Sequence, residues 1–170
     1  MIKELKTLHS GEPACQKRSD GDHLRFMVYR KRNEFKFEFS IELNGIKSWV
    51  VPDAPSMNPL DQRPAEEEEP EIDDINSLSL AAHAESSFTD KVMRSWDKGN
   101  YIPIDDDGNV LSEYEAFKCL QQGSLKFFLQ GKRLVGEFVL LKRGKMNWLL
   151  MKRHDEFALY NQHSYEWQEQ

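Results

Sequence analysis

The sequence predicts a mainly β fold, a small antiparallel β-barrel of about seven or eight strands with one or two flanking helices. Three observations predict it: a strictly alternating segment over residues 34–43, a strand-rich meander over 124–152, and one strong helix pattern over 112–122. A sandwich of the same strands remains an alternative. The chain has 170 residues, of which 39% are hydrophobic, so we expect one domain spanning 1–170.

The alternating segment has an apolar face and a polar face. The apolar face holds Phe35, Phe37, Phe39, Ile41 and Leu43, and the polar face holds Glu34, Lys36, Glu38, Ser40 and Glu42. This period of two predicts a half-buried strand. Asn44 and Gly45 tolerate positive φ, so we expect the chain to reverse there into a partner strand over 46–51. The polar face is then either a working site or solvated surface.

The N-terminal half contains two segments without a strand pattern. We expect an irregular lead-in over 1–23, followed by a strand over 25–31. Residues 53–76 contain four prolines and the run Glu66 to Glu69, which predicts an acidic, Pro-rich surface loop.

The C-terminal half returns to regular structure. Strands over 92–96 and 101–104 are expected to flank a turn. Ser112 and Glu115 form a capping box at the start of the helix, and Gly123 follows its end. We expect the tail, 160–170, to fray.

Composition and charge exclude several classes of protein. The formal net charge is −6, and residues 53–89 carry 10 acidic residues against a single Lys or Arg, so the chain lacks the global basic character of a dedicated nucleic-acid binder. A local basic patch at 30–32 remains open. The sequence has no apolar run that predicts a membrane span, and its two cysteines match no metal spacing, so we expect a cytoplasmic protein without membrane contact.

Acidic and aromatic residues elsewhere suggest no separate site. The turn Asp105 to Asn109 lacks the ligand spacing of a calcium loop and is expected to be solvated. The tryptophans at 49, 96 and 148 fall in strand patterns and are expected in the core. No two histidines lie at ligand spacing, so each is expected at the surface; they are His9, His23, His83, His154 and His163.

Several motifs are informative together. Residues 123–138 read GSLKFFLQGKRLVGEF and are followed by WLLMK at 148–152 and by Asp155. Earlier, 42–52 read ELNGIKSWVVP and 96–99 read WDKG. In their order and spacing these segments resemble the 3'-phosphoesterase domain of bacterial DNA ligase D, a family of DNA repair by end joining. The resemblance covers most of the chain.

The resemblance implies a β-barrel that uses a divalent metal, preferably manganese, to trim 3'-terminal ribonucleosides and 3'-phosphates. It implies DNA ends or DNA-repair proteins as partners. In the family, His and Asp side chains on the polar face of the alternating strand hold the metal, and an Arg grips the phosphate. Imidazole and carboxylate ligands suit manganese, and cationic groups suit the phosphate.

This chain departs from the family at those positions. Where the family has H-Y-D-F-R, the chain has KFEFS over 36–40. The positions that the resemblance assigns to the site are Lys31, Lys36, Glu38, Ser40, Arg63, Glu69 and Asp73. A protonated Lys36 repels a divalent cation and offers it no lone pair.

Two interpretations follow. In the first, the domain is a degenerate phosphoesterase that has lost its metal and serves as a binding or scaffolding module. In the second, Glu12, Glu38 and Glu69 form a carboxylate site for Mn²⁺ or Mg²⁺, while Arg63 and Lys36 hold phosphate.

Overall fold

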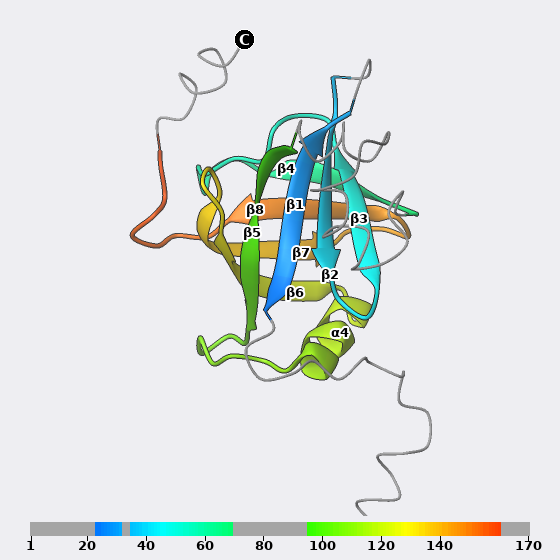
Figure 1. The fold of residues 1–170 in the computed structure, drawn as a ribbon, viewed down its shortest axis with the longest axis vertical. Coiled ribbons are helices and arrows are strands. Elements are labelled where there is room, and N and C mark those ends of the chain that lie inside the picture. Colours follow the sequence, from blue (N-terminus) through cyan, green and yellow to red (C-terminus); the bar gives the residue numbers. More distant parts are fainter. Residues whose placement is uncertain (1–22, 32–34, 70–94, 161–170) are drawn as a thin grey trace, which may run out of the picture.

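The computed structural model describes residues 23–31, 35–69 and 95–160, and the structural statements below concern these residues. Eight strands form a closed antiparallel barrel with the order β1-β2-β3-β4-β8-β7-β6-β5 (Figure 1). This confirms the predicted fold class and excludes the sandwich. The elements are β1 (Leu24–Arg30), β2 (Phe37–Glu42), β3 (Ile46–Val51), β4 (Arg63–Glu68), β5 (Ser95–Ile104), α4 (Glu113–Gln121), β6 (Ser124–Gln130), β7 (Val135–Lys142) and β8 (Asn147–Lys152).

The alternating segment forms β2 and reverses into β3 as expected. Asn44 and Gly45 both have positive φ, 51° and 94°. The register pairs Glu42 with Ile46, so three residues rather than two lie between the paired positions. This register places Ser40 opposite Ser48, a pairing that matters for the site described below.

The predicted acidic loop over 53–76 is wrong for residues 63–68, which form β4. This strand pairs with β3 and β8 and closes the barrel. Its alternation is short but present, because Ala65 packs in the core while Glu66 and Glu68 are exposed. Charge density therefore concealed a strand in which Glu66 and Glu68 face outward, while Glu67, on the side of Ala65, accepts a hydrogen bond from the core residue Trp148. Of the remaining 53–76 segment, residues 70–76 lie outside the described residues, as do 1–22 and 161–170.

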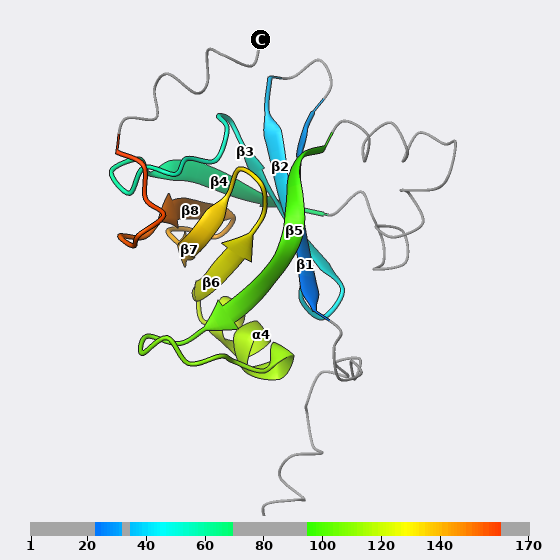
Figure 2. The same ribbon diagram turned by 60° about the vertical axis from the view of Figure 1, so that its left-hand side comes forward.

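The predicted turn at 97–100 is also wrong, since β5 is one continuous strand. Gly99 is needed there for close approach rather than for chain reversal. A Cβ at position 99 would lie 2.2 Å from the carbonyl oxygen of Gln130 on neighbouring β6. In Figure 2, β5 runs as a long strand beside β6 and continues toward α4.

The predicted helix is confirmed as α4. Ser112 is its N-cap and forms the capping box with Glu115, and Gly123 beyond its end has φ +92°. Ala116 and Leu120 face the core. Both ribbon views place α4 at one end of the barrel (Figures 1 and 2).

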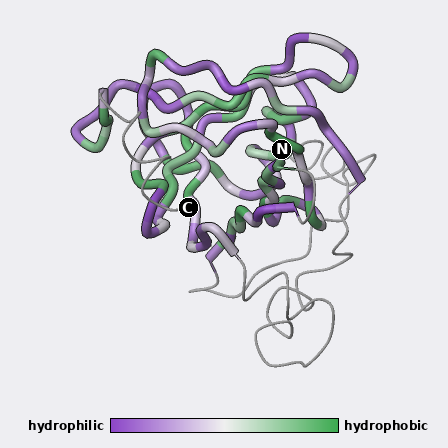
Figure 3. Tube along the Cα trace, turned by 90° about the horizontal axis from the view of Figure 1, so that it is seen from above, coloured by the Kyte–Doolittle hydropathy of each residue, from purple (hydrophilic) through white to green (hydrophobic). Residues whose placement is uncertain are grey.

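The core is rich in aromatic side chains. Hydrophobic and hydrophilic residues alternate along the strands (Figure 3), as barrel walls require. Phe39 stacks on Phe127 with ring centroids 5.9 Å apart, and Trp49 meets Trp148 edge-on. These two tryptophans confirm the core prediction, whereas Trp96 is only half-buried.

The structure describes only some of the residues on which the remaining sequence predictions depend. His23 and His154 are exposed as expected, and His9, His83 and His163 lie outside the described residues. The turn after β5 is solvated, with Asp105 Oδ1 accepting from the backbone N–H groups of Asp107 and Asn109. Within the described ranges, α4 falls well short of what a membrane-spanning helix requires.

Candidate functional site

The candidate site lies on the outer face of β1–β4, where the resemblance places the family's ligands. Phe39 and Ile41 point into the core, so Glu38 and Ser40 point outward. The expectation of a half-buried strand is nevertheless wrong on this face. Glu38 and Ser40 are only 1% and 3% exposed, and Glu42 is completely buried.

Partners on neighbouring strands allow polar groups of this face to be buried. The hydroxyls of Ser40 and Ser48 lie 2.7 Å apart and are hydrogen-bonded across the β2–β3 pair. Arg25 on β1 binds Glu42 through two side-chain contacts, from Nε to Oε1 at 2.7 Å and from Nη2 to Oε2 at 2.8 Å. Buried polar groups persist when they are satisfied in this way, so polarity in the sequence did not mean exposure.

An ion pair joins two elements that the resemblance assigns to the site. The resemblance assigns Lys31 to the site, and Glu68 directly precedes Glu69, another position that it assigns. Lys31 Nζ lies 3.4 Å from Glu68 Oε2, and the Lys31 side chain is 16% exposed. Lys36 is exposed, and its carbonyl oxygen accepts from the Lys31 backbone N–H at 2.7 Å.

The remaining predicted positions are not gathered around Glu38. Arg63 shares the inward side of β4 with Ala65, donates from Nε to the Ala54 carbonyl oxygen at 2.9 Å and lies 3.9 Å from Asp61. Glu69 is exposed just beyond the end of β4. Asp73 and Glu12 lie outside the described residues.

The proposed metal ligands therefore stay a prediction. Among residues that the structure describes, no group of three or more His, Cys, Asp or Glu side chains is arranged to hold a metal ion. Glu12 lies outside the described residues, so the set of Glu12, Glu38 and Glu69 stays untested.

Some of the motifs that carry the resemblance lie on β5–β8 and contribute further buried polar contacts. Asp97, in the WDKG segment, is buried and binds the turn between β6 and β7. Its carboxylate accepts backbone N–H bonds from Lys132 at 2.9 Å, Arg133 at 3.1 Å and Leu134 at 2.8 Å. A Cβ at Gly131 would lie 2.2 Å from this carboxylate, so that glycine makes room for Asp97.

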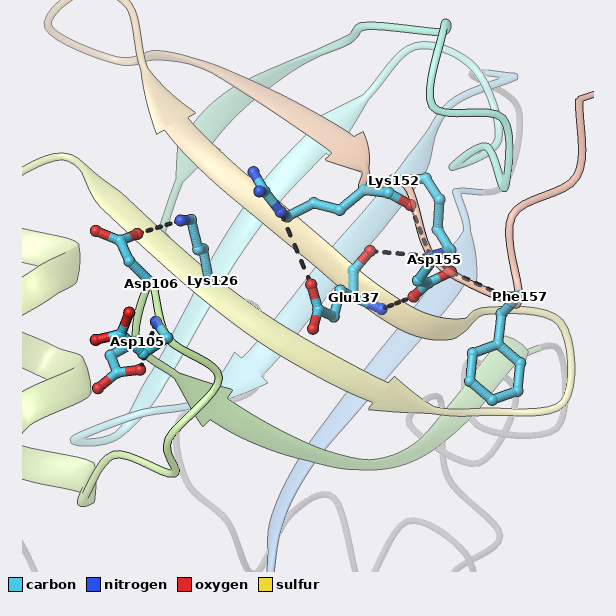
Figure 4. Close-up of polar contacts among 9 residues, drawn as sticks. Asp105, Asp106, Lys126, Glu137, Lys152, Asp155 and Phe157 are labelled. Atoms are coloured by element: carbon cyan, nitrogen blue, oxygen red, sulfur yellow. Dashed lines mark hydrogen bonds and ion pairs between the residues drawn. The ribbon is translucent and has the colours of Figure 1, made fainter.

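Lys152 and Asp155 form a buried ion pair on the same side (Figure 4). Lys152 Nζ lies 2.6 Å from Asp155 Oδ1 and also donates to the carbonyl oxygens of Glu137 and Arg153. Asp155 Oδ2 accepts the Glu137 backbone N–H at 2.8 Å. Gly136 has φ +102°, and a Cβ there would lie 2.5 Å from Asp155 Oδ2.

Burial and hydrogen bonding shift the pKa values of both Lys152 and Asp155. Burial lowers the pKa of Lys152, although the hydrogen bond and the negative charge of Asp155 oppose the change. Burial alone would raise the pKa of Asp155, but the hydrogen bonds from Glu137 N–H and Lys152 outweigh it and lower that pKa. The two charged forms therefore stabilise one another.

Neither the Lys31–Glu68 nor the Lys152–Asp155 ion pair was predicted from the sequence. For Lys152 the available signal was a lysine that follows apolar strand residues and lies three positions before an aspartate. Lys31 and Glu68 are too far apart in sequence to be paired without knowing that β4 is a strand.

Comparison with known families decides the relationship. Residues 30–142 match the family model described as the DNA Ligase D 3'-phosphoesterase domain. The chain belongs to this family. This 3'-phosphoesterase-like domain is 30% identical over 139 residues to the "Multifunctional non-homologous end joining protein LigD" of Pseudomonas aeruginosa. The match covers 78% of the present chain and 15% of that protein.

Membership confirms the predicted resemblance and relates the domain to DNA end processing. The matched range includes the positions that the resemblance assigns to the site, at which this chain carries Lys36, Glu38 and Ser40, and the roles of these residues stay a prediction.

Proposed function

We propose that this 3'-phosphoesterase-like domain is catalytically inactive and acts in the cytoplasm as a binding or scaffolding module at DNA ends. One observation carries the proposal: Glu38, at the position of the family's metal-binding Asp, is 1% exposed. A carboxylate that binds a metal in contact with a DNA phosphate must present an oxygen to that metal, and the metal must keep an open coordination position for the phosphate. Burial of Glu38 is unfavourable for that role.

The neighbours of Glu38 support the same function. Ser40 replaces the arginine that would grip phosphate, and its hydroxyl is bonded to Ser48. Lys31 replaces an imidazole and is paired with Glu68, so a fixed ammonium lies close to the acidic element. An ammonium supplies positive charge there but cannot activate water as a metal does.

Trimming assays test catalytic inactivity directly. A labelled primer-template ending in a 3'-phosphate or in one ribonucleotide is incubated with manganese or magnesium, with the matching domain of the Pseudomonas aeruginosa relative as positive control. We expect no trimming by the present chain and no rise in its Tm with either metal, because a metal bound only by the folded state must raise the Tm.

The opposite result is equally specific. Trimming that disappears in Glu38→Gln, while that variant keeps the parental Tm without metal, would establish the rewired carboxylate site and overturn the proposal. Trimming that survives in Glu38→Gln and Glu69→Gln would also overturn inactivity, and would place the chemistry elsewhere.

DNA binding is measured separately by the effect of DNA on Tm. A rise with a 3'-recessed duplex supports the binding module, since a ligand at about 100 times its Kd stabilises the folded state by about 2.7 kcal/mol. No rise with any DNA end, together with no trimming, leaves only a scaffolding role.

A further inference from the structure

Aromatic and cationic side chains gather at the end of the barrel opposite α4. We name this the aromatic rim, and it consists of Arg30, Phe35, Phe37, Trp96 and Arg133. The end of β1, the start of β2, the start of β5 and the turn between β6 and β7 bring these residues to one end. None of them belongs to the outer face described above.

Four members form a continuous ladder. The Arg30 guanidinium lies 5.9 Å from the ring centroid of Phe37, whose ring meets Trp96 edge-on at 5.6 Å. The Arg133 guanidinium lies 4.9 Å from the ring centroid of Trp96. Cations placed over aromatic faces are weakly hydrated and presented as flat surfaces.

The fifth member, Phe35, is not explained by folding. Its side chain is 81% exposed, and its backbone has φ 53°, a left-handed conformation that is rare for a bulky residue. An exposed Phe contributes little burial, and its left-handed conformation is itself unfavourable. Such an outlier points to a use outside the fold.

The charge at this end favours an anionic ligand. Exposed Lys36 follows Phe35, and exposed Lys132 precedes Arg133. Asp97, next to Trp96, is buried, and its carboxylate accepts hydrogen bonds from three backbone N–H groups of the turn. Flat aromatic and guanidinium surfaces among cations suit single-stranded DNA, whose bases are free to stack, better than duplex, whose bases are already stacked.

We infer that the aromatic rim binds single-stranded DNA, with a base stacked on Phe35 and the backbone held by Arg30, Lys36 and neighbouring cations. The inference rests on the proposed function and deepens it, because it specifies the overhang of a DNA end as the bound part. An acidic peptide would meet the same charges but has no rings to stack.

The test measures fluorescence anisotropy with a labelled oligodeoxythymidine of about 12 nucleotides and a blunt duplex of equal length. The full chain is used at low and at physiological salt. We expect the single strand to bind more tightly than the duplex. Phe35→Ala should weaken single-strand binding roughly 5- to 150-fold, the loss expected for one base–aromatic stack.

Two variants at the α4 end serve as controls, because each removes an apolar or a cationic side chain outside the aromatic rim. Val110→Ala removes an exposed apolar side chain, 71% exposed, and Arg143→Gln removes an exposed arginine; both should bind like the parent chain. Arg30→Gln should weaken binding and lower the salt slope by about 1. Unchanged far-UV circular dichroism and Tm show that each variant is folded.

The inference is overturned by no single-strand binding at low salt, by equal affinity for duplex, or by parental affinity in Phe35→Ala. Competition by a polyglutamate peptide as strong as by the oligonucleotide would also overturn it, because the rim would then bind by charge alone. None of these outcomes bears on catalytic inactivity, which the trimming assay decides independently.

Discussion

The two sides of the barrel differ in what their polar residues do. On the side of β5–β8, Asp97, Lys152 and Asp155 each hold backbone groups or one another in buried positions. On the side of β1–β4, the positions that the resemblance assigns to the site carry Lys36, Glu38 and Ser40. The family match over residues 30–142 includes Asp97 and all three of these positions, whereas Lys152 and Asp155 lie outside it. Family membership alone therefore says little about the chemistry of the domain.

The two sides also differ in the free energy that is lost when one of their polar residues is replaced. A buried charge pair cannot lose one member without leaving the other uncompensated. A buried hydroxyl pair is neutral and costs less to break, and an exposed lysine such as Lys36 costs least. Of these groups, the Lys152–Asp155 pair is therefore expected to tolerate substitution least.

The largest effect is expected at Asp155. Asp155→Ala leaves the ammonium of Lys152, which is completely buried, without its counter-charge, and leaves the Glu137 N–H without an acceptor. We expect the free energy of unfolding to fall by about 3–5 kcal/mol, measured by urea denaturation.

The control is the second ion pair visible in Figure 4, Lys126 with Asp106. The Asp106 side chain is 87% exposed, so Asp106→Ala should change stability by less than about 1 kcal/mol. Similar losses in the two variants would show that burial of the Lys152 pair has no energetic consequence, contrary to the comparison drawn above.

A smaller effect is expected on the other side, at Ser40. Ser40→Ala leaves the Ser48 hydroxyl, 1% exposed, without its partner, which should cost about 1–3 kcal/mol. The double variant Ser40→Ala/Ser48→Ala should be more stable than the sum of the single losses predicts, and Lys36→Ala should stay within about 0.5 kcal/mol of the parent. Strict additivity in urea denaturation would argue against the hydroxyl pair.

The sequence predicted what periodicity and local chemistry determine. Alternation located β2, the capping box located α4, and Asn44 and Gly45 supplied positive φ. The sequence prediction failed at β4, because the run of four glutamates indicated a loop and the alternation that indicates a strand is only three residues long. It also failed at Gly99, which allows close packing against β6 and forms no turn.

The candidate site was predictable only by analogy. Strand periodicity placed Glu38 and Ser40 on one face, but their burial depends on register and on partners remote in sequence, such as Arg25 for Glu42. The offset of one residue in the β2–β3 turn is what brings Ser40 opposite Ser48. The residues of the turn do not determine whether two or three residues lie between the paired positions, so this register could not be predicted from local sequence.

The smallest effect, and the one that best isolates the two charges, is the dependence of stability on pH. The folded-state pKa of Asp155 is lowered, so its contribution is complete above about pH 4 and is lost as pH falls through the folded pKa. Asp105 and Glu115, whose pKa values are lowered by hydrogen bonds from Asn109 and Ser112, act in the same window. Urea midpoints should therefore fall from about pH 5 toward pH 2, and less steeply in Asp155→Asn.

Lys152 acts at the alkaline end with the opposite trend. Its folded-state pKa is lowered by burial, so the unfolded chain binds more protons between that pKa and about 10.4, and stability rises with pH across this window. Asp155→Asn removes the charge that opposes the shift, so the rise should begin at lower pH than in the parent. A parental acid slope in that variant, or an unmoved alkaline rise, would show that the two groups do not stabilise each other's charged forms.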